Sequence, residues 1–265
     1  MLIKKPDDIK GSEITDPQVY ARRREVLKAA AALGIGAIAG QAQALVGPVV
    51  KGMPIGDVLD SQYGRDLQPT AYEHVTGYNN FYEFGTVKGD PARNAHTLKT
   101  RPWTVVVDGE CEAPGEIGIE DILSGFTQEE RIYRLRCVEA WLMVVPWVGF
   151  PLGDLLKRFK PTSRAAYVRF ETLVDKEQMP GQRRPVLDWP YREGLRMDEA
   201  MHPLTIIATG LYGEVLPNQN GAPLRLATPN KYGIKCLKRI GVIRYTNERP
   251  ADYWAERSYD WYAGL

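Results

Sequence analysis

In the stretch RIYRLRCVEAW, residues 131–141, positively charged side chains alternate with other side chains just before the cysteine, and the interpretation of the chain begins from this pattern. Tyr133 and Cys137 share one parity, and Arg134 and Arg136 share the other. A period of two predicts a half-buried strand with the thiol near its end. Neighbouring positive charge would lower the pKa of the thiol and favour the thiolate, which binds soft metals. Local pattern alone leaves the commoner alternative open, a cysteine that is only a small buried hydrophobe.

Composition places the chain among ordinary globular proteins. The chain has 265 residues, of which 44% are hydrophobic and 25% charged, and its formal net charge is +1. This balance does not point to nucleic acid or to an anionic membrane surface as a partner. The three cysteines and three histidines lack zinc-clip spacing, and no GxGxxG or P-loop pattern is present. Neither a zinc site nor a nucleotide site is therefore expected.

Residues 1–44 predict an export signal. RRREVLK at 22–28 is followed by the apolar run AAAALGIGAIAG at 29–40 and by an A-x-A at 42–44. The run is too short to span a bilayer comfortably and has no polar face, which argues against an amphipathic helix. The pair Arg23-Arg24 with the residues after it fits the twin-arginine pattern. We therefore expect export to the periplasm in the folded state, a route often used by proteins that carry a cofactor.

The remainder predicts an irregular lead-in at 45–76, with a short helix near 57–61, and then one domain at 77–265. Strands are expected at 103–110, 111–117, 131–137, 166–173, 204–208, 224–227 and 240–245, and helices at 119–123 and 151–159. A turn is expected at Pro146 and Gly149, and 180–201 is expected to be irregular with a short helix near Met197. Because strands and short helices do not alternate strictly, the predicted class is α+β.

Seven blocks of sequence occur in order between residues 76 and 250. They are GYNNFYEFG, ERIYRLRCVEAW, VVPWVGFPL, QMPGQ, GLRMDEAMHPLT, QNGAPLRL and KYGIK. Together they resemble the catalytic subunits of periplasmic protein-methionine-sulfoxide reductases, a molybdopterin-dependent family within the sulfite oxidase superfamily. The resemblance implies a sulfite-oxidase-type molybdopterin-binding fold, with mixed strands and short helices.

The same resemblance implies one molybdenum atom, held by a single molybdopterin and by one protein thiolate, which the block RCVEAW places at Cys137. Glu139, as the candidate catalytic residue, and Asn80 would lie near the metal. The pterin-binding positions transfer to Asn79, Tyr82, Glu83, Thr172, Asn220, Arg225, Cys236, Leu237 and Lys238. Asparagine amides suit the donors and acceptors of a pterin edge, and Arg225 and Lys238 suit a phosphate.

Three positions depart from the family pattern. Cys236 stands where many relatives have a small serine or glycine, so a second thiol is expected near the cofactor phosphate. Asn230 replaces a tryptophan common before K-Y-G, and the chain ends at Leu265 where longer relatives continue. We expect the last difference to affect the covering of the active site and its docking surfaces. Without the resemblance, the lysines of 231–238 would equally suit a solvated basic loop.

The activity implied by the resemblance is reduction of protein-bound methionine sulfoxide by oxygen-atom transfer. Electrons would come from a membrane haem partner, since the chain shows no transmembrane span and no C-x-x-C-H motif. One alternative keeps the cofactor but makes the chain a sulfite dehydrogenase, or a reductase of small sulfoxides or N-oxides. A second is a periplasmic binding or scaffold protein in which Cys137 belongs to the core.

Overall fold

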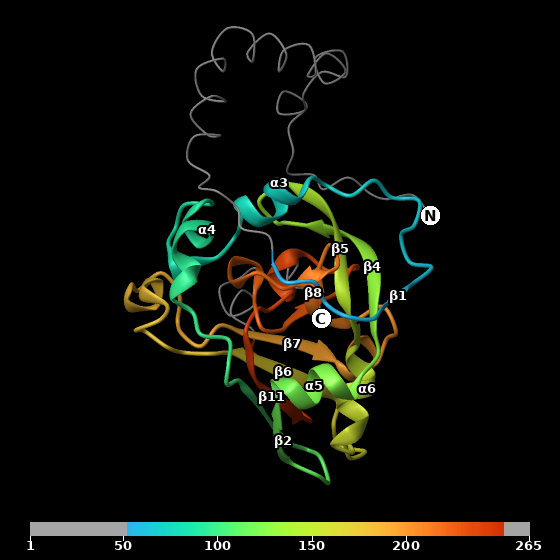
Figure 1. The fold of residues 1–265 in the computed structure, drawn as a ribbon. Coiled ribbons are helices and arrows are strands. Elements are labelled where there is room, and N and C mark those ends of the chain that lie inside the picture. Colours follow the sequence, from blue (N-terminus) through green and yellow to red (C-terminus); the bar gives the residue numbers. More distant parts are fainter. Residues whose placement is uncertain (1–51, 252–265) are drawn as a thin grey trace, which may run out of the picture. The chain divides into compact units, whose positions relative to one another are not determined.

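The computed structural model describes residues 52–251 (Figure 1), so the expected signal peptide at 1–44 and the chain end at Leu265 lie outside the described residues. Two sheets form the frame of this part of the chain. In the first, the strand order is β1-β4-β5-β8-β10, with β9 paired to β8, and in the second it is β3-β2-β11-β6-β7. The mixture of sheets with short helices confirms the α+β class.

The strands of the first sheet are β1 (Val58–Asp60), β4 (Gln128–Arg136), β5 (Leu142–Pro151), β8 (Ile206–Leu211), β9 (Glu214–Val215) and β10 (Arg225–Ala227). Those of the second are β2 (Thr104–Gly109), β3 (Gly115–Gly118), β6 (Tyr167–Thr172), β7 (Arg192–Arg196) and β11 (Ile240–Thr246). The α-helices are α3 (Tyr72–Gly77), α4 (Asp90–Asn94), α5 (Ile119–Gly125), α6 (Leu152–Arg158) and α7 (Met197–Ala200). Short 3-10 turns are η2 (Tyr82–Phe84), η3 (Ala95–Thr97), η4 (Pro180–Arg183), η5 (Asn218–Asn220) and η6 (Gly233–Lys235). No helix within residues 52–251 is both long and apolar enough to cross a membrane.

Two apolar clusters explain the arrangement of the sheets. The larger joins residues of both sheets, among them Phe150 of β5, Phe170 of β6 and Ile243 of β11. The smaller covers the other face of the first sheet, where Trp147 of β5 packs with Val75 of α3. Central strands β5 and β8 are consequently buried on both faces, which is why their sequences are apolar without alternation.

The strand β5 corrects the expected turn at Pro146 and Gly149. Both residues lie inside a strand of ten residues. Proline fits because the carbonyl of Pro146 points toward β8, accepting the amide of Tyr212 at 2.9 Å, so no bond to β4 is lost. Gly149 marks a register shift against β8, where a Cβ would lie 2.1 Å from the carbonyl oxygen of Ile207. The residues were therefore signs of a bulge and not of a turn.

Two further expectations need correction. The short helix expected near 57–61 is the strand β1, which pairs in parallel with the start of β4. Within the segment expected to be irregular, Arg192–Arg196 is the strand β7. The polar composition of β7 gives no apolar pattern from which a strand could be predicted. Glu193 in this strand is fully buried because its carboxylate is paired with Lys235. The strands expected at 103–110, 166–173 and 240–245 and the helices expected at 119–123 and 151–159 are confirmed as β2, β6, β11, α5 and α6.

Candidate active site

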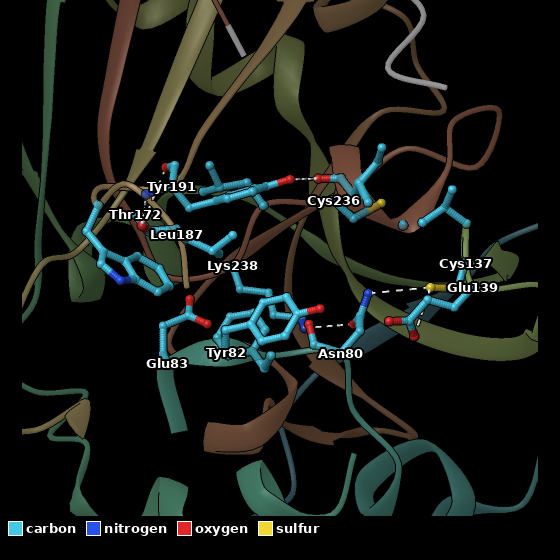
Figure 2. Close-up of a pocket in the computed structure, with 16 residues that line it drawn as sticks. Asn80, Tyr82, Glu83, Cys137, Glu139, Thr172, Leu187, Tyr191, Cys236 and Lys238 are labelled. Carbon is cyan, nitrogen blue, oxygen red and sulfur yellow. Dashed lines mark hydrogen bonds between the residues drawn. The ribbon is translucent and has the colours of Figure 1, made fainter. Parts of the chain in front are cut away.

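A pocket of about 770 Å³ of empty space, open mouth included, lies where the end of β4 in one sheet meets the end of β6 in the other. Figure 2 shows its walls converging from loops that are far apart in the sequence. The lining residues are Asn80, Phe81, Tyr82, Glu83, Cys137, Val138, Glu139, Thr172, Leu187, Trp189, Tyr191, Gly233, Ile234, Cys236, Leu237 and Lys238. The structure thus brings together most of the residues predicted for the site.

Cys137 sits in the turn that joins β4 to β5. Its amide donates to the carbonyl of Trp141 at 2.9 Å, and its carbonyl accepts the amide of Ala140 at 3.2 Å. Ala140 adopts a positive φ of 70°, as the tight reversal requires. The thiol is 2% exposed, and its sulfur lies 3.8 Å from Asn80 Nδ2 and 3.8 Å from Glu139 Oε2. An amide donor and a carboxylate therefore flank the sulfur on the pocket wall.

Glu139 is held as a carboxylate. Lys88 Nζ lies 2.6 Å from one of its oxygens, and the indole nitrogen of Trp141 donates to the other at 3.0 Å. Partial burial on its own would raise the pKa of Glu139, but the bonds from Lys88 and Trp141 outweigh it and lower that pKa below its ordinary value. Glu139 is therefore an anchored anion at neutral pH, with Lys88 as its counter-ion.

The expectation that Arg134 and Arg136 keep the thiol deprotonated is wrong. Both are exposed, because they occupy the parity opposite to the cysteine. Burial raises the pKa of the Cys137 thiol, and the cations that oppose this effect are Lys88 and Lys238. Arg134 and Arg136 therefore do not act on the thiol.

Buried positive charge collects at the inner end of the pocket. Lys238 is 5% exposed, with Nζ 3.1 Å from Asn80 Oδ1 and 3.6 Å from the ring centre of Phe81, while Arg239 is 0% exposed and stacks on the same ring at 4.3 Å. The buried carboxyl beside them is Glu83. Burial lowers the pKa of Arg239 to about 10 and that of Lys238 well below its ordinary value. Buried charge without a partner is unfavourable by several kcal/mol, so this cluster is suited to an anionic ligand.

Asn79, Asn220 and Arg225 lie outside the pocket lining. Arg225 is 2% exposed and donates to the carbonyl of Asn220 at 2.8 Å and to that of Cys236 at 3.2 Å. It therefore ties η5 to the loop that carries Cys236, Leu237 and Lys238. The buried Oδ1 atoms of Asn79 and Asn220 have no hydrogen-bond partner within residues 52–251. Buried polar atoms are rarely left without one, so both sites favour a polar ligand group.

The other predicted residues take defined positions on the wall. Thr172 ends β6, and its hydroxyl accepts the amide of Tyr191 at 3.1 Å. The Cys236 sulfur accepts from the amide of Thr228 at 3.5 Å, so the expected second thiol is buried against the segment just after β10 and also lines the pocket. Gly221, with φ +112°, lets Lys238 approach, since a Cβ there would lie 2.9 Å from the lysine Cβ.

Sequence reasoning missed the aromatic side of the pocket. Trp189 and Tyr191 line it from a segment that was expected to be irregular. The indole nitrogen of Trp189 is buried without a hydrogen-bond partner in the described part of the chain. The dense W-P-Y pattern at 189–191 was the signal that could have indicated an ordered aromatic wall.

The loop after β10 holds two buried lysines in opposite electrostatic situations. Lys235 Nζ lies 2.6 Å from Glu193 Oε2, with both side chains fully buried, and Tyr191 donates to the other Glu193 oxygen at 2.7 Å. Lys238 faces the pocket, bonds only to oxygens of Asn80 and carries no ion pair within residues 52–251. One lysine thus anchors the loop, and the other leaves its charge for a ligand.

This contrast yields a prediction with two opposite signs. In the cofactor-free protein, Lys238→Met should raise the free energy of unfolding by about 1 kcal/mol, because a desolvated cation is removed, whereas Lys235→Met should lower it by about 3–5 kcal/mol by orphaning Glu193. Urea unfolding measures both values. Lys238→Met should nevertheless bind less molybdopterin. A Lys238→Met protein that is destabilised as much as Lys235→Met would contradict the assignment of Lys238 as a ligand-facing charge.

Similarity to known proteins identifies the class to which this fold and site belong. Residues 92–254 match the oxidoreductase molybdopterin binding domain. The sulfane dehydrogenase SoxCD of Paracoccus pantotrophus has the same fold, with a TM-score of 0.51 and 16% identity over 72% of this chain and 51% of that one, so the chain spans about half the length of that structure. The chain is accordingly an oxidoreductase of the molybdopterin-binding class.

Closer relatives narrow the class. The protein-methionine-sulfoxide reductase catalytic subunit MsrP of Xanthomonas axonopodis pv. citri is 54% identical over 93% of this chain and 77% of its own length. The subunits of Xanthomonas campestris pv. campestris and Burkholderia mallei are 55% and 47% identical, over 92% and 100% of this chain and 76% and 84% of their own lengths. The chain belongs to the family of protein-methionine-sulfoxide reductase catalytic subunits, which confirms the resemblance drawn from the seven blocks.

Proposed function

We propose that the chain reduces methionine sulfoxide in protein substrates by oxygen-atom transfer. The net reaction consumes two electrons and two protons, turns the sulfoxide into a thioether and releases its oxygen as water. The observation that carries this proposal is one pocket that joins a soft ligand, Cys137, to a buried cation cluster suited to a phosphate. The activity for which the relatives are named supports it.

The residues of the pocket fit one molybdenum atom and one molybdopterin per chain. Cys137 would supply the protein ligand, and the described residues contain no cluster of three or more metal-binding side chains that could hold a metal unaided. Lys238, with the loop that Arg225 fastens, would hold the phosphate, and Asn79, Asn220 and the other predicted positions would meet the pterin. When bound, this group supplies the two-electron redox chemistry that protein side chains lack.

The residues around Cys137 give the chain its own part in the reaction. Asn80 Nδ2 can donate to a sulfoxide oxygen brought to the sulfur's side of the pocket. Glu139 forms an ion pair with Lys88 at the mouth of the pocket, so a fixed pair of opposite charges lies beside Cys137. We assign Asn80 to orienting the substrate oxygen and the Lys88–Glu139 pair to shaping the entrance.

The alternative of sulfite oxidation receives less support from this arrangement. Sulfite is an anion, and the pocket wall at Cys137 presents the Glu139 carboxylate, to which Lys88 is already paired as the counter-ion. Like charge at the reacting position disfavours an anionic substrate. A neutral sulfoxide meets no such repulsion, so the charge pattern favours it.

The deciding experiment measures metal content and substrate preference on exported, purified protein. We expect about one molybdenum and one pterin per chain and faster turnover of methionine sulfoxide than of sulfite with a small-molecule electron donor or acceptor. Absence of molybdenum would favour the scaffold alternative. Molybdenum-loaded protein that oxidises sulfite but reduces no sulfoxide would establish the sulfite dehydrogenase alternative.

Electron supply belongs to the same proposal. The relatives are named catalytic subunits, which supports a second subunit that delivers electrons. We propose that a membrane haem protein fills this role and that oxidised periplasmic proteins are the substrates. Co-purification of the chain with a haem-containing membrane protein, and loss of sulfoxide reduction in cells that lack that protein, would test the route.

Periplasmic location through the twin-arginine route makes a separate prediction. Changing Arg23→Lys together with Arg24→Lys should leave a folded, cofactor-loaded precursor in the cytoplasm, because the paired guanidinium groups are the export signal. Cell fractionation with an antibody against the chain measures the location. Lysine substitution at Arg22 alone serves as the control and should leave export intact. Mature protein outside the cytoplasm in the double variant would exclude this route.

A further inference from the structure

A second hollow lies beside the active-site pocket. It holds about 1270 Å³ of empty space, open mouth included, and runs along the outer edge of β4. Its lining residues are Tyr63, Gly64, Asp66, Leu67, Ile132, Tyr133, Arg134, Arg136, Leu142, Leu204, Pro229, Asn230, Lys231 and Tyr232. We call this hollow the edge groove. It meets the pocket at two places along the chain, since Arg136 precedes Cys137 and Tyr232 precedes Gly233.

The edge of β4 in this groove is open. β1 pairs only with Gln128–Glu130, at the far end of the strand. On the β5 side, Arg134 is opposite Val144, whose amide and carbonyl bond to Thr70 and so point away from β4. In an antiparallel ladder, such a pair leaves both backbone groups of Arg134 directed at the outer edge.

Ile132, two residues before Arg134, also directs its backbone groups to the outer edge, and there a hydrogen-bond partner is present. The amide of Ile132 donates to the carbonyl of Tyr63 at 3.1 Å on this outer side. Arg136 has the same parity as Ile132 and Arg134. Within residues 52–251, no hydrogen bond is made by the outward backbone groups of Arg134 or Arg136. Gly233 lies against the carbonyl of Arg136, since a Cβ at this glycine would be 3.5 Å from the carbonyl oxygen, so the backbone that is open to another strand is that of Arg134.

The groove also carries free positive charge. Arg134 and Arg136 are exposed, and neither forms an ion pair in the described part of the chain. The third cation, Lys231, is already bonded to Glu199 at 2.6 Å. The acid among the lining residues is Asp66, for which no ion pair to the two arginines occurs in residues 52–251. The charge of the groove is therefore complementary to an acidic segment.

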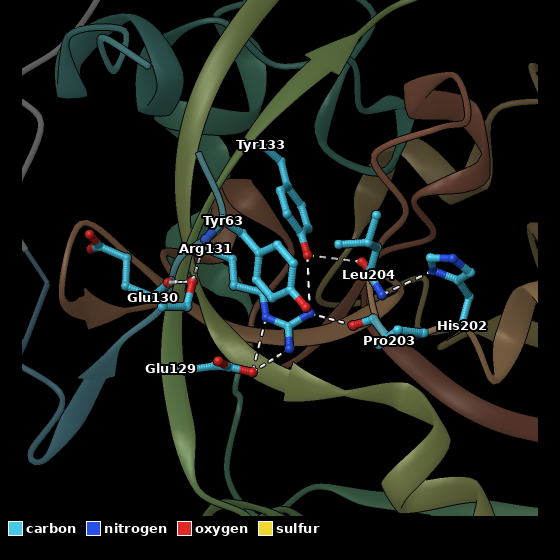
Figure 3. A network of polar contacts seen from close by, with 9 residues as sticks. Tyr63, Glu129, Glu130, Arg131, Tyr133, His202, Pro203 and Leu204 are labelled. Atoms are coloured by element: carbon cyan, nitrogen blue, oxygen red, sulfur yellow. Dashed lines mark hydrogen bonds and ion pairs between the residues drawn. The ribbon is translucent and has the colours of Figure 1, made fainter. Parts of the chain in front are cut away.

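The floor of the groove is fixed by a buried network (Figure 3). Arg131 stacks on the ring of Tyr63 at 4.6 Å and bonds to Glu129, to the Pro203 carbonyl and, at 3.2 Å, to the hydroxyl of Tyr133. That hydroxyl donates to the Leu204 carbonyl at 3.0 Å. The side chains of this network already have hydrogen-bond partners within the protein, so they hold the shape of the groove without a bound ligand.

We propose that an extended segment of the protein substrate adds to the outer edge of β4 as a short strand, with acidic residues near the sulfoxide contacting Arg134 and Arg136. This inference rests on the proposed function and names how its substrate binds. Backbone pairing accepts many sequences, as a repair enzyme for varied proteins requires, and alternate side chains point to opposite sides of an added strand. Cys137 follows Arg136 directly, so the pocket begins where the added strand would end.

Peptides test the charge part of the inference with the cofactor-loaded enzyme and a small-molecule electron donor. Matched peptides carry one methionine sulfoxide flanked by glutamates, by serines or by lysines. We expect kcat/KM to be about tenfold higher for the acidic than for the basic peptide, as two partly exposed ion pairs allow. Arg134→Glu with Arg136→Glu should invert this order. Lys157→Glu, an exposed charge reversal on α6 outside both hollows, is the matched control and should preserve it.

A second pair of variants isolates the backbone. Arg134→Ala removes the guanidinium but keeps the outward amide, whereas Arg134→Pro removes both and spares the bonds to β5. For the serine-flanked peptide, kcat/KM should be about two- to tenfold lower in the proline variant than in the alanine variant, the loss of one net hydrogen bond. Methylating the peptide's backbone nitrogens beside the sulfoxide should produce a loss of the same kind without any change in the enzyme.

The outcomes separate this inference from the proposed function. If no sulfoxide of any size is reduced, the proposed function is wrong. If free methionine sulfoxide and all peptides are reduced, but peptide charge, backbone methylation and the two Arg134 variants leave kcat/KM unchanged, the docking inference is overturned alone. Variants that impair electron delivery from the membrane donor but leave peptide kinetics intact would instead assign the edge groove to that partner.

Discussion

Cys137→Ser is expected to abolish sulfoxide reduction while the protein still folds. Serine is nearly isosteric, and the side chain is 2% exposed, so packing in the turn after β4 changes little. Its oxygen is a harder and far less acidic donor than a thiol and does not replace a thiolate toward a soft metal. We expect kcat to fall by at least about 100-fold, beyond the range found when groups merely supporting a ligand are lost.

The measurement combines turnover, molybdenum and pterin content, and circular dichroism of the purified variant. Cys111→Ser provides the matched control, because Cys111 is a half-buried free cysteine whose backbone forms an isolated β-bridge with Pro161, and it lies outside the pocket lining. It should retain full activity. A Cys137→Ser protein that binds molybdenum and still reduces sulfoxide at a substantial rate would remove Cys137 from the role of metal ligand.

The alternation in residues 131–141 predicted the geometry of this part of the site correctly. Tyr133 and Cys137 are buried, and Arg134 and Arg136 are exposed, as a period of two requires. What the pattern could not predict is which charges reach the sulfur. Lys88 and Lys238 do so from segments distant in the sequence, the first between η2 and α4 and the second between η6 and β11. Contacts of this kind follow from tertiary structure alone.

Pro146 and Gly149 show where local rules failed for the fold. Both residues indicate turns when the sequence is taken alone. In the structure, the neighbouring strands explain both residues. The nitrogen of Pro146 points away from β4, so the missing N–H costs no hydrogen bond to that strand, and Gly149 lies against the backbone of β8 at a bulge. The strand β7 was missed for a related reason, since Glu193 is buried by an ion pair that no pattern in its own segment reveals.

The candidate ligand residues were predicted by family resemblance, and the structure separates them into two groups. Cys137, Lys238 and Thr172 face the pocket, whereas Arg225 lies outside its lining and bonds to the loop that carries Cys236. Sequence motifs do not distinguish a side chain that touches a ligand from one that holds the loop doing so. The distinction matters for mutational tests, because the second kind changes the binding site through the backbone.

Arg225→Ala is accordingly expected to empty the pocket of cofactor by releasing its inner loop. The guanidinium joins the carbonyls of Asn220 and Cys236 and stacks on Trp147 at 4.6 Å. Alanine removes the donor to both carbonyls and leaves a cavity against the indole. Each lost hydrogen bond of a buried charged donor costs roughly 1.5–3 kcal/mol. The loop carrying Lys238 then loses its fixed position, and cofactor affinity should fall about 10–100-fold.

Arg225→Lys should have an intermediate effect, because lysine keeps a positive charge but lacks the planar fork that reaches both carbonyls. Molybdenum and pterin content, measured per folded chain with urea unfolding alongside, separates occupancy from stability. Arg131→Ala is the matched control: Arg131 is equally buried and also bonds to a backbone carbonyl, that of Pro203, but lies outside the pocket. It should lower the free energy of unfolding while the folded fraction still carries full cofactor. If Arg225→Ala also binds full cofactor and differs only in stability, Arg225 is purely structural and the loop does not depend on it for holding the phosphate.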